Sequence, residues 1–274
     1  MIFFLKEFNL FYFKNIIFRF DERGLHKSKG GNWYESRITD FRDDVLEGIA
    51  YIKSRPQFRN CLIGIIGHSK GGITAMTAAV FSSNVDFLVL LGSPATNIIN
   101  EFLGQFVKVN NCMEKKLFKK RYEHAVKAYD SIFTINDRAE LNERIQNLSI
   151  TYNYSDANKV FLSPWFKDVV TFEPREVLKN ITIPVLGLYG SKDLLIEPER
   201  NLKALNFSLT LAGNLNFKLK ILPNLNHQFQ TANFGYIEEF YFINETMSPV
   251  ALREIKEFIN QVPLMLKKNN SQKL

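Results

Sequence analysis

Cysteine and histidine are scarce in this sequence. Its 274 residues include two cysteines, Cys61 and Cys112, and four histidines. The two cysteines form neither the spacing of a zinc site nor the framework of a disulfide-rich domain. We therefore expect no metal centre and no cofactor, and the cysteines do not indicate a redox compartment.

Long hydrophobic runs are also missing. The first twenty residues are apolar, but Lys6, Glu7, Lys14 and Arg19 interrupt them. A membrane-spanning helix needs about twenty mostly apolar residues, and a signal peptide needs an unbroken apolar centre before a small-residue cleavage site. Neither pattern is present, so we expect a cytoplasmic protein without a membrane partner.

The formal net charge is +7. Part of it is concentrated in the cluster Lys115, Lys116, Lys119, Lys120 and Arg121, and part in Lys267, Lys268 and Lys273. Such clusters can attract an anionic partner or a membrane surface. No aromatic nucleic-acid motif accompanies them, so we interpret them as solvated helix faces and expect no nucleic-acid partner.

The stretch from Cys61 to Val80 carries the strongest motif. An apolar run over 62–66 predicts a buried strand, and an Ala- and Met-rich run over 73–80 predicts a buried helix. Between them lies Gly-His-Ser-Lys-Gly-Gly, residues 67–72. Glycine-rich turns of this kind can also bind phosphate. The sequence G-x-S-x-G between a strand and a helix is typical of a nucleophile elbow, which exposes the hydroxyl of Ser69 above the sheet.

Short apolar runs alternate with helical patterns along the chain. Runs that predict strands lie at 16–20, 62–66, 87–91, 185–189 and 217–222. Helical spacing predicts helices over 2–13, 38–52, 73–80 and 198–211, and a last helix that starts at Pro249 with Ser248 as its cap. This alternation predicts an α/β fold with a doubly wound, mostly parallel sheet.

The segment 95–179 has a different character, because it is polar and mostly helical. One apolar stripe follows helical spacing over 118–133, and Leu141, Ile145 and Leu148 form another. We interpret 95–179 as a helical cap, inserted between core parts 1–94 and 180–266, and expect a disordered tail over 267–274.

Three predicted strands end in loops that carry Ser69, Asp193 and His227. The carboxyl ends of parallel strands share one edge of the sheet, where reactive groups gather. A serine hydroxyl becomes a good nucleophile when a base takes its proton. We assign that role to His227, with Asp193 orienting its imidazole.

Other residues compete less well for these roles. His26 lies in a loop without an acidic companion that follows a predicted strand. His68 lies within the elbow, and His124 falls in the predicted cap. Among the acids, Glu197 is further from its strand end than Asp193, and Asp168 falls in the cap.

The order Ser, acid, His is that of an α/β-hydrolase triad. The chain resembles bacterial α/β-hydrolase esterases related to prolyl-oligopeptidase-like and acyl-thioester hydrolases. The matching stretches are FRFDERG (18–24), IGHSKGG (66–72), SPWF (163–166), IPVL (183–186) onward to Asp193, NHQFQ (226–230) and ETMSP (245–249). The resemblance implies an α/β-hydrolase fold with a helical cap and carries over Ser69, Asp193 and His227 as the triad. It implies the backbone N–H of Lys70 as one oxyanion donor.

The sequence departs from its relatives in three places. His26 stands where relatives usually have glycine, and Lys70 where they usually have glutamate. Relatives also have strands before residues 21–24, with a glycine-rich loop that supplies a second oxyanion donor. We therefore expect an N-terminally truncated member whose sheet is open beside the Ser69 strand, unless residues 16–20 cover that edge. The cytoplasmic location is expected for the chain as given, and full-length relatives could be exported proteins.

The sequence thus predicts a serine hydrolase that cleaves small-molecule esters of small acyl groups through an acyl-enzyme. A peptidase or a thioesterase would use the same triad. The missing oxyanion loop supports another hypothesis, a catalytically weak or inactive remnant that acts as a binding module. The sequence leaves the oligomeric state and the acyl and alcohol preferences open.

Overall fold

The computed structural model describes residues 16–32, 35–98, 101, 119, 123, 126, 127, 130, 131, 134–152 and 163–271. The predicted helix over 2–13, Cys112, His124 and most of the basic cluster lie outside these residues. The chain divides into two compact units. The first comprises 1–21, 41–96 and 173–274, and the second comprises 22–40 and 97–172.

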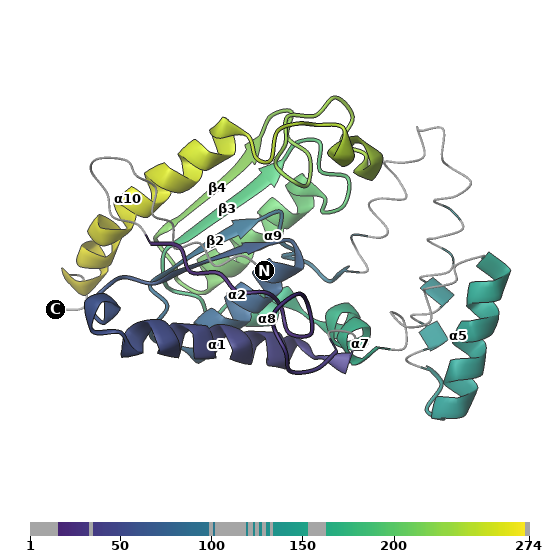
Figure 1. The fold of residues 1–274 in the computed structure, drawn as a ribbon. Helices are drawn as coiled ribbons and strands as arrows, with labels where there is room; N and C mark the ends of the chain where they lie inside the picture. The colour runs from purple at the N-terminus through teal and green to yellow at the C-terminus, as the bar shows by residue number, and fades with distance from the viewer. Residues whose placement is uncertain are drawn as a thin grey trace. The chain divides into compact units, whose positions relative to one another are not determined.

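A four-stranded parallel sheet forms the centre of the first unit (Figure 1). Its strands are β1 (Gly64–His68), β2 (Phe87–Leu91), β3 (Val185–Gly190) and β4 (Phe217–Leu222), and they lie side by side in chain order. β2 and β3 are buried along their whole length, as expected for strands covered on both faces. The predicted α/β fold is confirmed.

Helices pack against both faces of the sheet. On one face, Phe258 and Ile255 of α10 (Pro249–Ser271) join a core with Val89 and Leu186. On the opposite face, α9 (Pro198–Leu211) packs so closely that a Cβ at Gly187 would lie 2.6 Å from Leu205. The helix α2 (Lys70–Phe81) follows β1 in the chain and precedes β2. It contacts α8 (Pro174–Leu178).

Sequence patterns predicted several of these elements. The helix α1 spans Ile38–Ser54, and its buried residues Ile38, Phe41, Val45, Ile49 and Ile52 are those of the predicted stripe. The helix α9 and the strands β2 and β4 have the predicted bounds. Short 3₁₀ helices lie at Pro56–Phe58 (η2) and Ile237–Tyr241 (η3).

Two predicted local structures are wrong. Residues 16–20 are not a strand, because Phe18 and Phe20 pack against α1 instead. Their rings lie 3.3 Å from a Cβ built on Gly48, and Phe18 stacks on Tyr51 with 5.7 Å between ring centroids. The expected disorder after Lys267 is also wrong as far as Ser271, because α10 continues to that residue.

The first strand and the inserted segment also differ from the prediction. The strand β1 begins at Gly64 rather than Leu62. Ile63, just before it, donates its backbone N–H to the carboxylate of Asp86 and accepts the backbone N–H of the same residue. The second unit ends at Phe172, so α8 belongs to the first unit rather than to the predicted cap. Residues 22–40 belong to the second unit.

The second unit contains α5 (Arg138–Tyr152) and α7 (Pro164–Thr171). Ser163 caps α7 by accepting a hydrogen bond from the backbone N–H of Phe166. Phe166 and Val170 form a small core with Leu141 and Ile98. No helix among the described residues is long and apolar enough to cross a membrane.

Candidate active site

Ser69 lies in the turn between β1 and α2, with backbone angles φ 53° and ψ −125°. A positive φ is rare for a residue with a side chain, and strain of this kind is found at functional sites. A Cβ at Gly67 would lie 2.4 Å from the backbone oxygen of Gly71, so the turn needs glycine there. Although Ser69 is at the N-cap of α2, its side chain makes no capping hydrogen bond. The hydroxyl of Ser69 is therefore not used to cap the helix.

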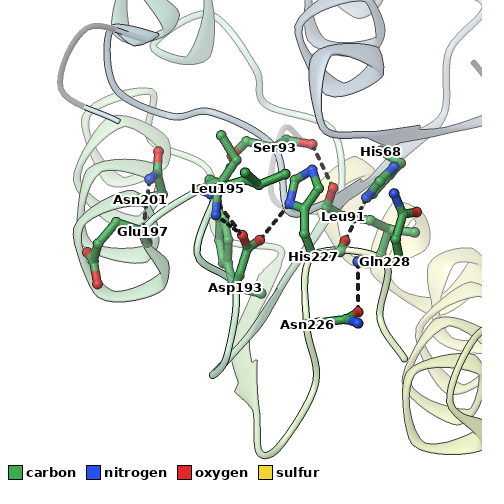
Figure 2. A network of polar contacts seen from close by, with 12 residues as sticks. His68, Leu91, Ser93, Asp193, Leu195, Glu197, Asn201, Asn226, His227 and Gln228 are labelled. Carbon is green, nitrogen blue, oxygen red and sulfur yellow. Dashed lines mark hydrogen bonds and ion pairs between the residues drawn. The ribbon is translucent and has the colours of Figure 1, made fainter. Parts of the chain in front are cut away.

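Asp193 and His227 form a buried acid–base pair at the ends of β3 and β4 (Figure 2). The Oδ2 atom of Asp193 is 2.8 Å from Nδ1 of His227. The other carboxylate oxygen accepts hydrogen bonds from the backbone N–H groups of Leu195 and Ile196, at 2.9 and 2.8 Å. A carboxylate bound at Nδ1 assigns the proton to that nitrogen, and Nε2 of His227 is left to accept one.

Gly92, directly after β2, connects this pair with the serine turn. Its φ is +51°, and a Cβ on it would lie 3.2 Å from Oδ2 of Asp193 and 3.3 Å from Nδ1 of His227. The carbonyl of Leu91, the residue before it, accepts the backbone N–H of Ser69 at 2.8 Å. The structure therefore brings all three predicted triad residues to one edge of the sheet.

The loop of His227 is held by buried amides. Oδ1 of Asn226 accepts the backbone N–H groups of Gln228 and Gln230, at 2.9 and 3.0 Å. The side chain of Gln230 donates in turn to the carbonyls of Phe240 and Glu245. Sequence reasoning missed this network, although both amides lie in the stretch NHQFQ that carries part of the resemblance.

His68, the residue before the serine, contacts the predicted base directly. Its Nε2 is 2.8 Å from the backbone oxygen of His227, and the two ring centroids are 4.8 Å apart. Burial lowers the pKa of His68 from 6.5 to about 4, and the neighbouring His227 also lowers it. The ring is therefore neutral near pH 7.

The competing acids and histidines have other surroundings. Glu197 accepts the backbone N–H of Arg200 and so caps α9. Asp168 binds the side chain of Arg37 and the backbone N–H of Ile38 within the second unit. His26 belongs to the second unit as well, with φ 48°.

Lys70 is the first residue of α2, at the helix end toward which the backbone N–H groups of the first turn point. Its ammonium group lies 5.1 Å from the ring centroid of Phe41 on α1. No group of three or more His, Cys, Asp or Glu side chains that could hold a metal ion occurs among the described residues.

The parallel sheet, the strained serine after β1 and the acid–base pair after β3 and β4 define an α/β-hydrolase. A family model described as "Serine aminopeptidase, S33" matches residues 13–231. The chain belongs to this family of hydrolases.

Solved structures with a similar fold include several hydrolases. An enol-lactonase from Burkholderia xenovorans is 16% identical with a TM-score of 0.49, and the match covers 90% of this chain and 82% of the other. A lipase-esterase related protein from Clostridium acetobutylicum is 20% identical with a TM-score of 0.48, over 87% and 81% of the two chains. An esterase from Exiguobacterium antarcticum is 17% identical with a TM-score of 0.43, over 81% and 76%. No curated protein matches this sequence.

Proposed function

We propose that the protein is a serine hydrolase that cleaves carboxylic esters of small acyl groups through an acyl-enzyme intermediate. The observation that carries the proposal is the buried Asp193–His227 hydrogen bond, next to a serine whose hydroxyl is not used for capping. These are the parts that activate a serine by removing its proton.

The first half of the reaction forms the acyl-enzyme. Oγ of Ser69 attacks the ester carbonyl carbon while Nε2 of His227 takes the hydroxyl proton. The carbonyl oxygen becomes an oxyanion, toward which the backbone N–H of Lys70 donates at the N-terminus of α2. The C–O bond then breaks, and His227 gives its proton to the departing alkoxide, which leaves as the alcohol.

The second half releases the acid. Water attacks the carbonyl carbon of the acyl group on Oγ of Ser69 and gives a proton to Nε2 of His227. The new tetrahedral intermediate collapses, the bond to Oγ breaks, and His227 returns the proton to Ser69. Asp193 stays ionised and stabilises the imidazolium in both halves.

Aminopeptidase activity is the second candidate function, because the description of the matched family names a serine aminopeptidase. The same proton transfers serve an amide, with an amine as the leaving group. A thioester would be cleaved by the same steps with a thiol as the leaving group.

A matched set of chromogenic substrates separates these functions. We expect p-nitrophenyl acetate and butyrate to be hydrolysed faster than amino-acid p-nitroanilides and acyl thioesters, compared by kcat/KM. Ser69→Ala is the control for background hydrolysis. Faster turnover of a p-nitroanilide with a free α-amino group would favour the aminopeptidase, and equal rates for wild type and Ser69→Ala on every substrate would contradict a serine hydrolase.

A further inference from the structure

The side chain of His68 contacts the main chain of His227. A carbonyl oxygen can only accept a hydrogen bond, so the 2.8 Å contact requires a proton on Nε2 of His68. The ring of His68 also packs beside Phe229, which is fully buried, with 6.3 Å between the ring centroids. This packing fixes the direction in which the N–H group points.

This hydrogen bond differs from that made by Asp193. Asp193 holds the imidazole ring of His227, whereas His68 holds its backbone at the carbonyl (Figure 2). His68 is also bonded covalently to Ser69, so one residue connects the nucleophile to the main chain of the predicted base.

The ring of His68 is a neutral hydrogen-bond donor beside the predicted base. Burial is the main cause of the lowered pKa of His68. Of the groups that face its ring, His227 lowers this pKa through its charge and raises it through the backbone hydrogen bond, and the charge of Asp193 raises it. A neutral donor adds no positive charge beside His227, which must itself become a cation during the reaction. A lysine or arginine in this place would oppose that proton transfer.

We propose that His68 is a positioning residue, which fixes the backbone of His227 relative to Ser69 through its Nε2–H hydrogen bond. This inference rests on the proposed function, because it assigns His227 as the base. Misplacement of a catalytic group by about 1 Å can reduce a rate about a hundredfold. Loss of the bond should therefore reduce kcat and leave substrate binding nearly unchanged.

Two variants separate the hydrogen bond from the volume of the ring. His68→Phe keeps a ring but removes the donor, whereas His68→Gln keeps an N–H donor of similar reach. With p-nitrophenyl acetate, we expect kcat of His68→Phe to fall about 10- to 100-fold, with KM within about threefold of wild type. We expect His68→Gln to stay within about threefold of wild type in both constants. The proposal is wrong if His68→Phe retains wild-type kcat, or if folded His68→Gln is as slow as His68→Phe.

Imidazole NMR supplies a readout that does not depend on turnover. In ¹⁵N-labelled protein we expect the His68 ring to carry its proton on Nε2 and not to titrate between pH 5 and 9. The Nδ1 proton of His227, bound to Asp193, should exchange with water faster in His68→Phe than in wild type and His68→Gln. Equal exchange in all three proteins would overturn the positioning role. Absence of ester hydrolysis by a wild-type protein with the expected NMR pattern would instead refute the proposed function.

Discussion

The turn around Ser69 and the loop around His227 reach the same edge of the sheet by different physical means. The turn depends on backbone geometry, with a positive φ at Ser69 and no room for a Cβ at Gly67. The loop depends on side-chain hydrogen bonds. Asp193 and Asn226 accept buried ones, and His68 donates a partly buried one. Steric geometry is specified by a few adjacent residues, whereas a hydrogen-bond network draws residues from several parts of the chain. The two regions should therefore respond differently to substitution.

The largest expected effect comes from breaking the pair in the loop. Asp193→Asn and His227→Ala should each reduce kcat/KM for p-nitrophenyl acetate by about 10⁴-fold. The kcat/KM of the double variant should lie within about tenfold of that of the slower single variant, because triad members act as a unit. Steady-state kinetics on the three variants test this, and strictly multiplicative losses would show that the two residues act independently.

Asn226 tests the loop without touching the proposed chemistry. Asn226→Leu removes the acceptor of two backbone N–H groups, that of Gln230 in a buried bond and that of Gln228 in a partly buried one. A buried donor left without its acceptor costs about 1–3 kcal/mol. The free energy of unfolding, measured by urea denaturation, should fall by about 2–5 kcal/mol. Gln228→Ala is the matched control, because its backbone N–H remains and its side chain is exposed. A stable Asn226→Leu variant would mean that the network does not hold the loop.

Gly67 tests the turn. Gly67→Ala places a methyl group 2.4 Å from a backbone oxygen, which only a shift of the turn can relieve. We expect a loss of about 1–3 kcal/mol in stability and a marked loss of activity. Gly213→Ala is the control, since φ is +67° there but the space is open. The free energy of unfolding of Gly213→Ala should fall by about 1–2 kcal/mol, and its specific activity should stay unchanged. Unchanged activity of Gly67→Ala would contradict the steric account of the turn.

The smallest expected effect is on the pH dependence of stability. The folded-state pKa of His68 is about 4, below the value of 6.5 expected in the unfolded chain. As the pH falls from about 6.5 to about 4, the unfolded chain binds a proton here that the folded chain does not, so stability decreases. With allowance for partial solvent exposure, the loss should be about 1–2 kcal/mol. Urea denaturation across this range should give a shallower decrease for His68→Gln, and parallel curves would disprove the shift.

The contrast between turn and loop also explains what could be predicted from sequence. The helices α1 and α9 followed from local periodicity, because burial of one helix face imposes it residue by residue. The strand β2 followed from an unbroken apolar run. The motif G-x-S-x-G located the turn at Ser69, because the turn leaves no room for a side chain at Gly67, two residues before the serine. The order of the loops then placed Asp193 and His227 at the same edge.

Contacts between distant segments could not be predicted in the same way. The apolar residues 16–20 suit a strand or a packed loop equally well, and the rings of Phe18 and Phe20 pack on α1 instead of extending the sheet. The bond from His68 to the carbonyl of His227 joins residues 159 positions apart, and a carbonyl leaves no mark in a sequence. The grouping of residues 22–40 with the second unit likewise depends on tertiary packing, including the hydrogen bond between Arg37 and Asp168.

Labelling by a fluorophosphonate tests the central claim, that the described site activates Ser69, most directly. The probe reacts only with an activated serine, and peptide mass spectrometry locates the modified residue. We predict modification at Ser69 alone in wild type, slow modification in His227→Ala, and none in a folded Ser69→Ala variant. Modification of a different serine, or equal labelling of wild type and Ser69→Ala, would contradict the account.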